Sequence, residues 1–188
     1  MKKIITTIVA VLLSLSANAM AEGMKVGVGY MMASSEVDVA DFDTTAVGIS
    51  LSNSVGPNFE VEGVVAFGLD DDTYSDYDPF LGDFSVTGEL ASMLGVFAKL
   101  HSDSASGFQV FGRVGLAMLD FDVDIDTQNF GPVSESYDDT GVAFGAGASF
   151  NFSETGAIVV EYTKLPDVDF EGVDIETEVI SIGLQMSL

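Results

Sequence analysis

The segment FQVFGRVGLAMLDFDVDID, residues 108–126, alternates in two phases that exchange character part-way along. One phase is apolar from Phe108 to Met118 and acidic from Asp120 to Asp126, while the other is small or polar first and apolar afterwards. Successive side chains of a strand point to opposite sides, so one side of this strand passes from an apolar to an aqueous environment near Met118. A strand that leaves a bilayer meets such a boundary, whereas a soluble sheet keeps one core side throughout. The segment predicts a membrane-spanning strand.

The same change from apolar to acidic within one phase occurs in three other segments. In residues 24–38 the apolar part comes first and the acidic part follows. In residues 41–51 and 174–188 the acidic part comes first and the apolar part follows. In an up-and-down arrangement all of these acidic ends lie on one side of the membrane. The pattern therefore predicts an all-β fold, an eight-stranded antiparallel up-and-down transmembrane β-barrel.

Eight stretches of alternating residues have the length that a tilted spanning strand needs, roughly 9 to 11 residues or more. They are 23–33, 44–53, 58–68, 85–101, 107–119, 140–152, 157–165 and 175–188. The connections alternate between short turns (54–57, 102–106 and 153–156) and long loops (34–43, 69–84, 120–139 and 166–174). Bacterial barrels have short periplasmic turns and long outer loops. Of the 30 acidic residues, 22 lie in or next to the long loops, which predicts an acidic outer surface.

The first 21 residues have the order of a secretory signal. Lys2 and Lys3 precede an apolar run over 4–15, and small residues permit cleavage after Ala19 or Ala21. We therefore expect residues 1–21 to be a cleaved signal peptide and 22–188 to be one outer-membrane β-barrel domain, exported through the inner membrane to the cell outer membrane of a Gram-negative bacterium.

Composition excludes several functions. The formal net charge is −24, which argues against a nucleic-acid partner, and the chain has no cysteine for disulfides or thiolate metal sites. The single histidine, His101, stands beside Ser102, but no third catalytic member is visible, and we interpret it as a solvated turn residue. The sequence predicts no enzymatic activity and no cofactor.

Several segments resemble a known family. They are Phe111–Leu116, Gly141–Ala148, Val160–Lys164 and the ending Ile180–Leu188. Together they are similar to the small eight-stranded outer-membrane barrels, which include the OmpA transmembrane domain, OmpX and porin-family proteins. The ending is similar to the family's assembly signal, at Ser181, Gly183, Met186 and Leu188, although Leu188 replaces the usual terminal aromatic residue. The resemblance implies recognition by the barrel-assembly machinery, and we expect a monomer surrounded by outer-membrane lipid and lipopolysaccharide.

Strand phase also predicts what fills the lumen. Eight strands leave an interior just wide enough for side chains. Six charged residues of the short-turn half point inward, three basic and three acidic: Lys25, Glu60, Glu62, Lys99, Arg113 and Glu161. An unpaired charge in so confined a space costs several kcal/mol, so we expect a connected salt-bridge cluster. Such a cluster is either a packed structural plug or a charged gate for ions.

Acidic residues in the long loops are candidate metal ligands, although each set has a simpler interpretation. Asp120, Asp122, Asp124 and Asp126 have calcium-loop spacing, but no glycine follows at the turn position and the intervening residues alternate like a strand. Asp70, Asp71 and Asp72 are likewise more typical of a solvated loop than of a metal site. Divalent cations bound across the acidic surface remain candidate partners.

Residues near the strand ends predict the membrane interface. Seven aromatic residues share the lipid-facing phase: Tyr30, Phe59, Phe67, Phe108, Phe150, Phe152 and Tyr162. Lys164 is in the same phase, either reaching lipopolysaccharide phosphate or forming an ordinary charge at the rim.

Three functions are compatible with these features. They are a structural, surface-exposed barrel whose acidic loops contact cations, lipopolysaccharide or extracellular partners; a narrow passive channel; and an outer-membrane lipid-modifying enzyme. The first agrees best with a plugged lumen and the absence of a catalytic constellation.

Overall fold

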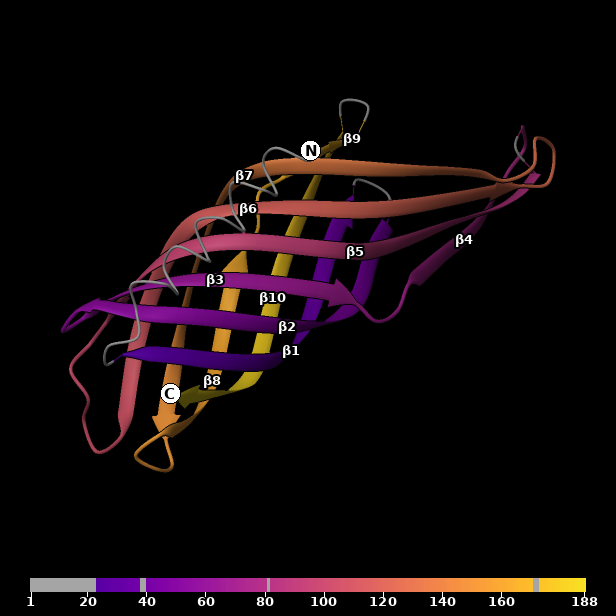
Figure 1. Cartoon of the computed structure of the whole chain (residues 1–188). Helices are drawn as coiled ribbons and strands as arrows, with labels where there is room; N and C mark the ends of the chain where they lie inside the picture. Colours follow the sequence, from indigo (N-terminus) through magenta and orange to yellow (C-terminus); the bar gives the residue numbers. More distant parts are fainter. Residues whose placement is uncertain (1–22, 38–39, 81, 171–172) are drawn as a thin grey trace.

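The computed structural model describes residues 23–37, 40–80, 82–170 and 173–188, which form antiparallel strands (Figure 1). Eight strands form a closed ring: β1 (Met24–Val37), β2 (Ala40–Gly56), β3 (Phe59–Gly68), β5 (Gly82–His101), β6 (Phe108–Thr127), β7 (Val133–Asn151), β8 (Gly156–Lys164) and β10 (Val173–Ser187). Each pairs with the next along the chain, and β1 pairs with β10 from Lys25–Ser187 to Glu36–Glu176. The predicted all-β, up-and-down architecture is confirmed. The predicted signal peptide, residues 1–21, lies outside the described residues.

No helix within the described ranges is long and apolar enough to cross a membrane.

The predicted loops over 34–43, 69–84 and 120–139 were largely wrong, because the strands on the long-loop side run on as hydrogen-bonded sheet. Strand β6 extends to Thr127 and β7 begins at Val133, and the two remain paired from Phe108–Phe150 to Ile125–Val133. Two short strands lie off the ring: β4 (Asp72–Asp78) pairs with β5, and β9 (Val168–Phe170) pairs with β10. Alternation continues beyond the apolar belt with the two sides exchanged, so the backbone has no reason to leave the sheet there.

The outer surface of the ring carries a belt of exposed apolar side chains. Val28, Leu116 and Ile182 are 52%, 59% and 50% exposed, whereas the residues on either side of each along the strand are buried or half-buried. Six of the seven predicted interface aromatics are exposed on this side, and Phe59 is half-buried. A continuous exposed apolar belt is incompatible with water but matches the lipid-facing surface of a transmembrane barrel.

The interior has two parts that differ in chemistry. Charged side chains lie in the half nearer the short turns, whereas the half nearer the long hairpins holds a hydrophobic core with Met93, Phe97, Leu119 and Phe121 at its centre. In the sequence this second part is visible only as the apolar residues that alternate with the acids after Met118. The interior is therefore filled by side chains over most of its length.

Val114, 53% exposed and near the middle of the belt on β6, tests the assignment of the belt to lipid. We expect Val114→Arg to lower the free energy of unfolding in lipid vesicles by about 2–4 kcal/mol, because it places a cation in hydrocarbon. The matched change Ser134→Arg, on the same outer side of the neighbouring strand but beyond the belt, should be nearly neutral in the same urea titration. Equal effects of the two substitutions would contradict the placement of the belt.

Candidate functional site: a buried charge cluster in the lumen

Four side chains from four strands meet inside the ring. Glu62 comes from β3, Lys99 from β5, Arg113 from β6 and Glu161 from β8. All four are buried, with exposed fractions of 3–6%. Lys99 and Arg113 are direct partners in the β5–β6 register and therefore lie side by side on one wall. Glu62 reaches them from β3, the strand next to β5, and Glu161 from β8, which β7 separates from β6. We call these four residues the lumen cluster.

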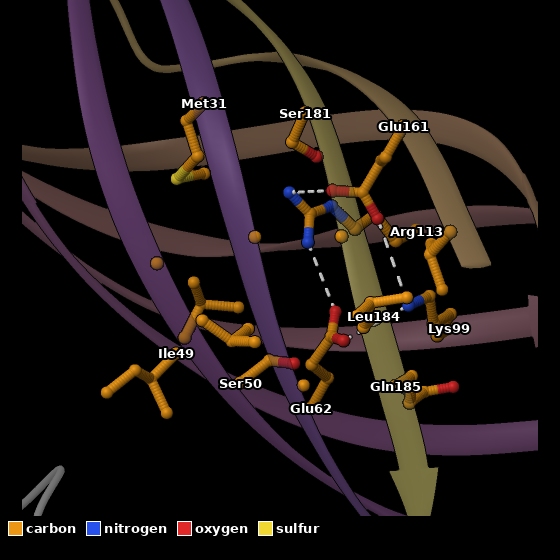
Figure 2. Close-up of a pocket in the computed structure, with 17 residues that line it drawn as sticks. Met31, Ile49, Ser50, Glu62, Lys99, Arg113, Glu161, Ser181, Leu184 and Gln185 are labelled. Atoms are coloured by element: carbon orange, nitrogen blue, oxygen red, sulfur yellow. Dashed lines mark hydrogen bonds and ion pairs between the residues drawn. The ribbon is translucent and has the colours of Figure 1, made fainter. Parts of the chain in front are cut away.

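Charges alternate around the lumen cluster (Figure 2). Arg113 donates from Nη1 to Glu62 Oε2 at 3.1 Å and contacts Glu161 Oε1 from Nη2 at 2.5 Å. Lys99 Nζ lies 3.1 Å from Glu62 Oε1 and 3.8 Å from Glu161 Oε2. Each cation therefore contacts both anions, which is the arrangement that offsets the cost of removing four charges from water.

Neutral side chains that the sequence analysis did not identify support the two cations. The Arg113 Cζ atom lies 4.1 Å from the ring centre of Phe97, and Lys99 Nζ lies 4.2 Å from that of Phe111. Arg113 Nη2 also donates to Thr163 Oγ1 at 2.7 Å. Both rings were detectable in principle, because each stands two residues before one of the cations and therefore shares its phase.

A glycine makes room for this stacking. A Cβ atom at Gly115 would lie 2.8 Å from both the Cα and the Cδ1 atoms of Phe97 and still closer to the Val96 carbonyl oxygen. Gly115 thus allows the Phe97 ring to lie across the lumen beneath Arg113, and a larger residue there would displace the ring.

The other two predicted members form a second group nearer the short turns. Lys25 forms an ion pair with Glu60, and Glu60 Oε2 also lies 2.9 Å from His101 Nε2. The interpretation of His101 as a solvated turn residue was wrong: β5 extends through His101, in phase with Lys99, and its side chain is only 11% exposed. Ser102 Oγ instead donates to the Asp103 carbonyl oxygen, so the neighbouring serine and histidine have different partners.

Two small cavities adjoin the charges. One of about 70 Å³ lies between the lumen cluster and a wall of small residues on β1, β2 and β10, including Gly29, Gly48 and Ser181. A second, of about 130 Å³, opens toward the short turns and is lined by Lys25, His101 and polar residues. Each has room for a few water molecules. Beyond the cluster the hydrophobic core takes over the interior.

The predicted acidic candidates do not converge. Asp120, Asp122, Asp124 and Asp126 follow one another along one side of β6, and alternate residues of a strand are roughly 7 Å apart. Asp120 accepts a hydrogen bond from Ser92 and Asp122 one from Ser136. Within the described ranges, no group of three potential ligands is arranged to hold a metal ion.

The candidates near β4 have backbone partners instead. Asp70 accepts a hydrogen bond from the Thr45 amide at 2.6 Å, and Asp72 accepts one from the Asp43 amide at 3.0 Å. Asp71 is exposed between them. These carboxylates therefore connect the β3–β4 segment to β2.

The remaining predicted residues lie on the ring wall. Lys164 is held by acidic neighbours, with Nζ 2.5 Å from Glu176 and 4.0 Å from Asp167. Within the proposed assembly signal, Ser181 and Gly183 line the lumen cavity, whereas Met186 and Leu188 are 59% and 76% exposed.

Comparison with known proteins agrees with this architecture. The chain matches the family described as "Outer membrane protein beta-barrel domain" over residues 7–187, and it therefore belongs to that family of outer-membrane proteins. None of the curated proteins matches it.

Solved structures share the fold at low sequence identity. The Neisserial surface protein A structure aligns with a TM-score of 0.58 at 14% identity, covering 89% of this chain and 98% of that one. Ail, the attachment invasion locus protein of Yersinia pestis, aligns at 0.54 and 17%, covering 88% and 100%. OprG from Pseudomonas aeruginosa aligns at 0.57 and 12%, covering 87% and 95%.

Arg113 is the test of the lumen cluster. Arg113→Ala leaves two buried carboxylates short of a cation, and we expect the free energy of unfolding to fall by about 3–5 kcal/mol. Gln109→Ala, on the same strand and in the same phase but outside the ion pairs, should cost much less in the same denaturant titration. If the two variants unfold alike, the cluster does not stabilise the barrel.

Proposed function

We propose that this outer-membrane protein is a structural, surface-exposed barrel with a plugged lumen. The observation that carries the proposal is the lumen cluster, in which two cations and two anions from four strands pair across the interior. The hydrophobic core fills the interior beyond it. A plug of this kind stabilises the barrel and leaves no room for a solute, since the cavities beside it hold about 70 and 130 Å³.

The proposal includes an orientation. The long hairpins face outward and the short turns at 102–106 and 153–156 face the periplasm, as in other bacterial barrels. The acidic residues of the outer ends then form the cell-surface side, where divalent cations, lipopolysaccharide or extracellular partners are the proposed contacts. An enzymatic role finds no support in the described residues, because the Ser102 and His101 side chains bind elsewhere.

A narrow channel is the alternative, and conductance separates the two. Refolded protein in a planar lipid bilayer should give no unitary conductance, because the ion-paired cluster and the core close the lumen. The charge-preserving variant Arg113→Lys serves as the control and should also stay closed. Steady unitary currents from the unmodified chain would overturn the plug and favour the channel.

Limited proteolysis of intact cells tests the orientation. Chymotrypsin should cut after Phe80 and Phe130, which are 72% and 64% exposed at the tips of the long hairpins. It should leave Phe108 and Phe152, next to the short turns, intact until the outer membrane is permeabilised. Cleavage beside the short turns in intact cells would reverse the proposed orientation.

A further inference from the structure

Four strands of the sheet continue past the ends of the other strands of the ring. Residues 82–90 of β5, 121–127 of β6 and 133–139 of β7 remain in register, and β4 adds to the edge of β5. Figure 1 shows β5, β6 and β7 extending together with β4 well beyond the ends of the other strands. We call this part the projecting sheet.

The two faces of the projecting sheet differ in chemistry. The face that continues the lumen side is apolar at its centre, where Val86 pairs with Ile125, Ile125 pairs with Val133, and Tyr74 lies opposite Val86 on β4. Carboxylates flank this centre on the same face, from Asp76 and Asp78 on β4 and from Glu135 on β7. Val133 is 50% exposed, while Tyr74, Val86 and Ile125 are half-buried. The opposite face carries the acidic phase of β6. The sheet therefore presents an apolar surface that the ring wall does not fully cover.

An apolar cavity lies at the base of this surface. It has a volume of about 80 Å³, and Val86, Phe121 and Val123 of the projecting sheet line it together with Phe42 and Ile175 from β2 and β10. Thr44 also lines the cavity, and its buried hydroxyl has no hydrogen-bond partner. An apolar protein cavity of roughly 150 Å³ binds benzene, so roughly half that volume suits a short aliphatic group.

Charge narrows the range of occupants. Segments 72–90 and 118–141, which contain the projecting sheet, have eleven acidic residues over 72–83 and 120–139 and one more at Glu89, and they have no lysine or arginine. Anionic headgroups and a second copy of this chain are therefore repelled, whereas a basic partner is attracted to the same place.

We propose that the apolar face of the projecting sheet binds a basic, amphipathic polypeptide, with an aliphatic side chain of the partner in the cavity between Val123 and Phe42. The cationic side chains of the partner then face the surrounding carboxylates. This proposal rests on the surface-exposed role proposed above and gives it a partner of defined chemistry.

Fluorescence anisotropy with synthetic peptides tests the chemistry of the partner. The probe is a labelled peptide of alternating leucine and lysine, titrated with refolded protein in nanodiscs of zwitterionic lipid, with empty nanodiscs as the blank. We expect saturable binding above the blank. A serine–lysine peptide of equal charge should bind about tenfold more weakly because it lacks the apolar group, and a leucine–glutamate peptide should not bind.

Two matched variants test the location. Val123→Lys places a cation on the apolar face, and Ser134→Lys makes the same charge change on the opposite face of the same sheet. We expect the first to weaken leucine–lysine binding about tenfold or more and the second to change it by less than about threefold. Val123→Ser, which removes the apolar side chain without adding charge, should also weaken binding.

Several outcomes would overturn the inference. Equal binding of the serine–lysine peptide would show a purely electrostatic surface, and equal effects of the two lysine variants would place binding elsewhere. Binding of all peptides to empty nanodiscs alone would show partition into lipid. The conductance and proteolysis experiments do not use these peptides. If the peptides fail to bind, the proposal of a plugged barrel with outward-facing long hairpins is therefore not contradicted.

Discussion

Closure of the sheet is the constraint on which the rest of the structure depends. Inside a bilayer no water is present to satisfy a backbone N–H or C=O group, so every strand must have two partners. The β1–β10 pairing, from Lys25 to Glu36 on one strand, supplies the last of these partnerships. Once the ring is closed with eight strands, its diameter is fixed, and so is the narrow space into which inward side chains must fit.

That narrow space explains the composition of the interior. Three of the four cations that follow residue 21, Lys25, Lys99 and Arg113, lie in the lumen and are ion-paired there. A buried ion pair is a weak source of stability compared with apolar packing, but a single missing partner is costly. Small residues such as Gly29 and Gly48 form the facing wall, and the cavity of about 70 Å³ lies between this wall and the cluster.

Most strands of the ring could be predicted from the sequence. The two-residue alternation shows which side chains face lipid, and the bilayer thickness sets the length that a spanning strand needs. The inward phase likewise identified Glu62, Lys99, Arg113 and Glu161, and the structure brings these four together. The ends of the strands did not follow, since hydrogen-bonded pairing depends on the neighbour rather than on the apolar belt. His101 was misjudged for the same reason: its position at the expected strand end concealed that it shares the inward phase of Lys99.

The exchange of phase near Met118 has a second consequence. Before Met118 the apolar residues of β6 face lipid and its inward residues are largely polar or small. After Met118, Phe121, Val123 and Ile125 face inward and the acidic residues face water. At the base of the projecting sheet, Phe121 is covered by the opposite wall and is only 6% exposed. Farther along β6, the opposite strands end before the projecting sheet does. The alternation that places Phe121 in the core therefore leaves Ile125 and Val133 on an open apolar surface. The same alternation that packs the interior of a closed barrel thus produces, where closure stops, an apolar surface whose burial is incomplete.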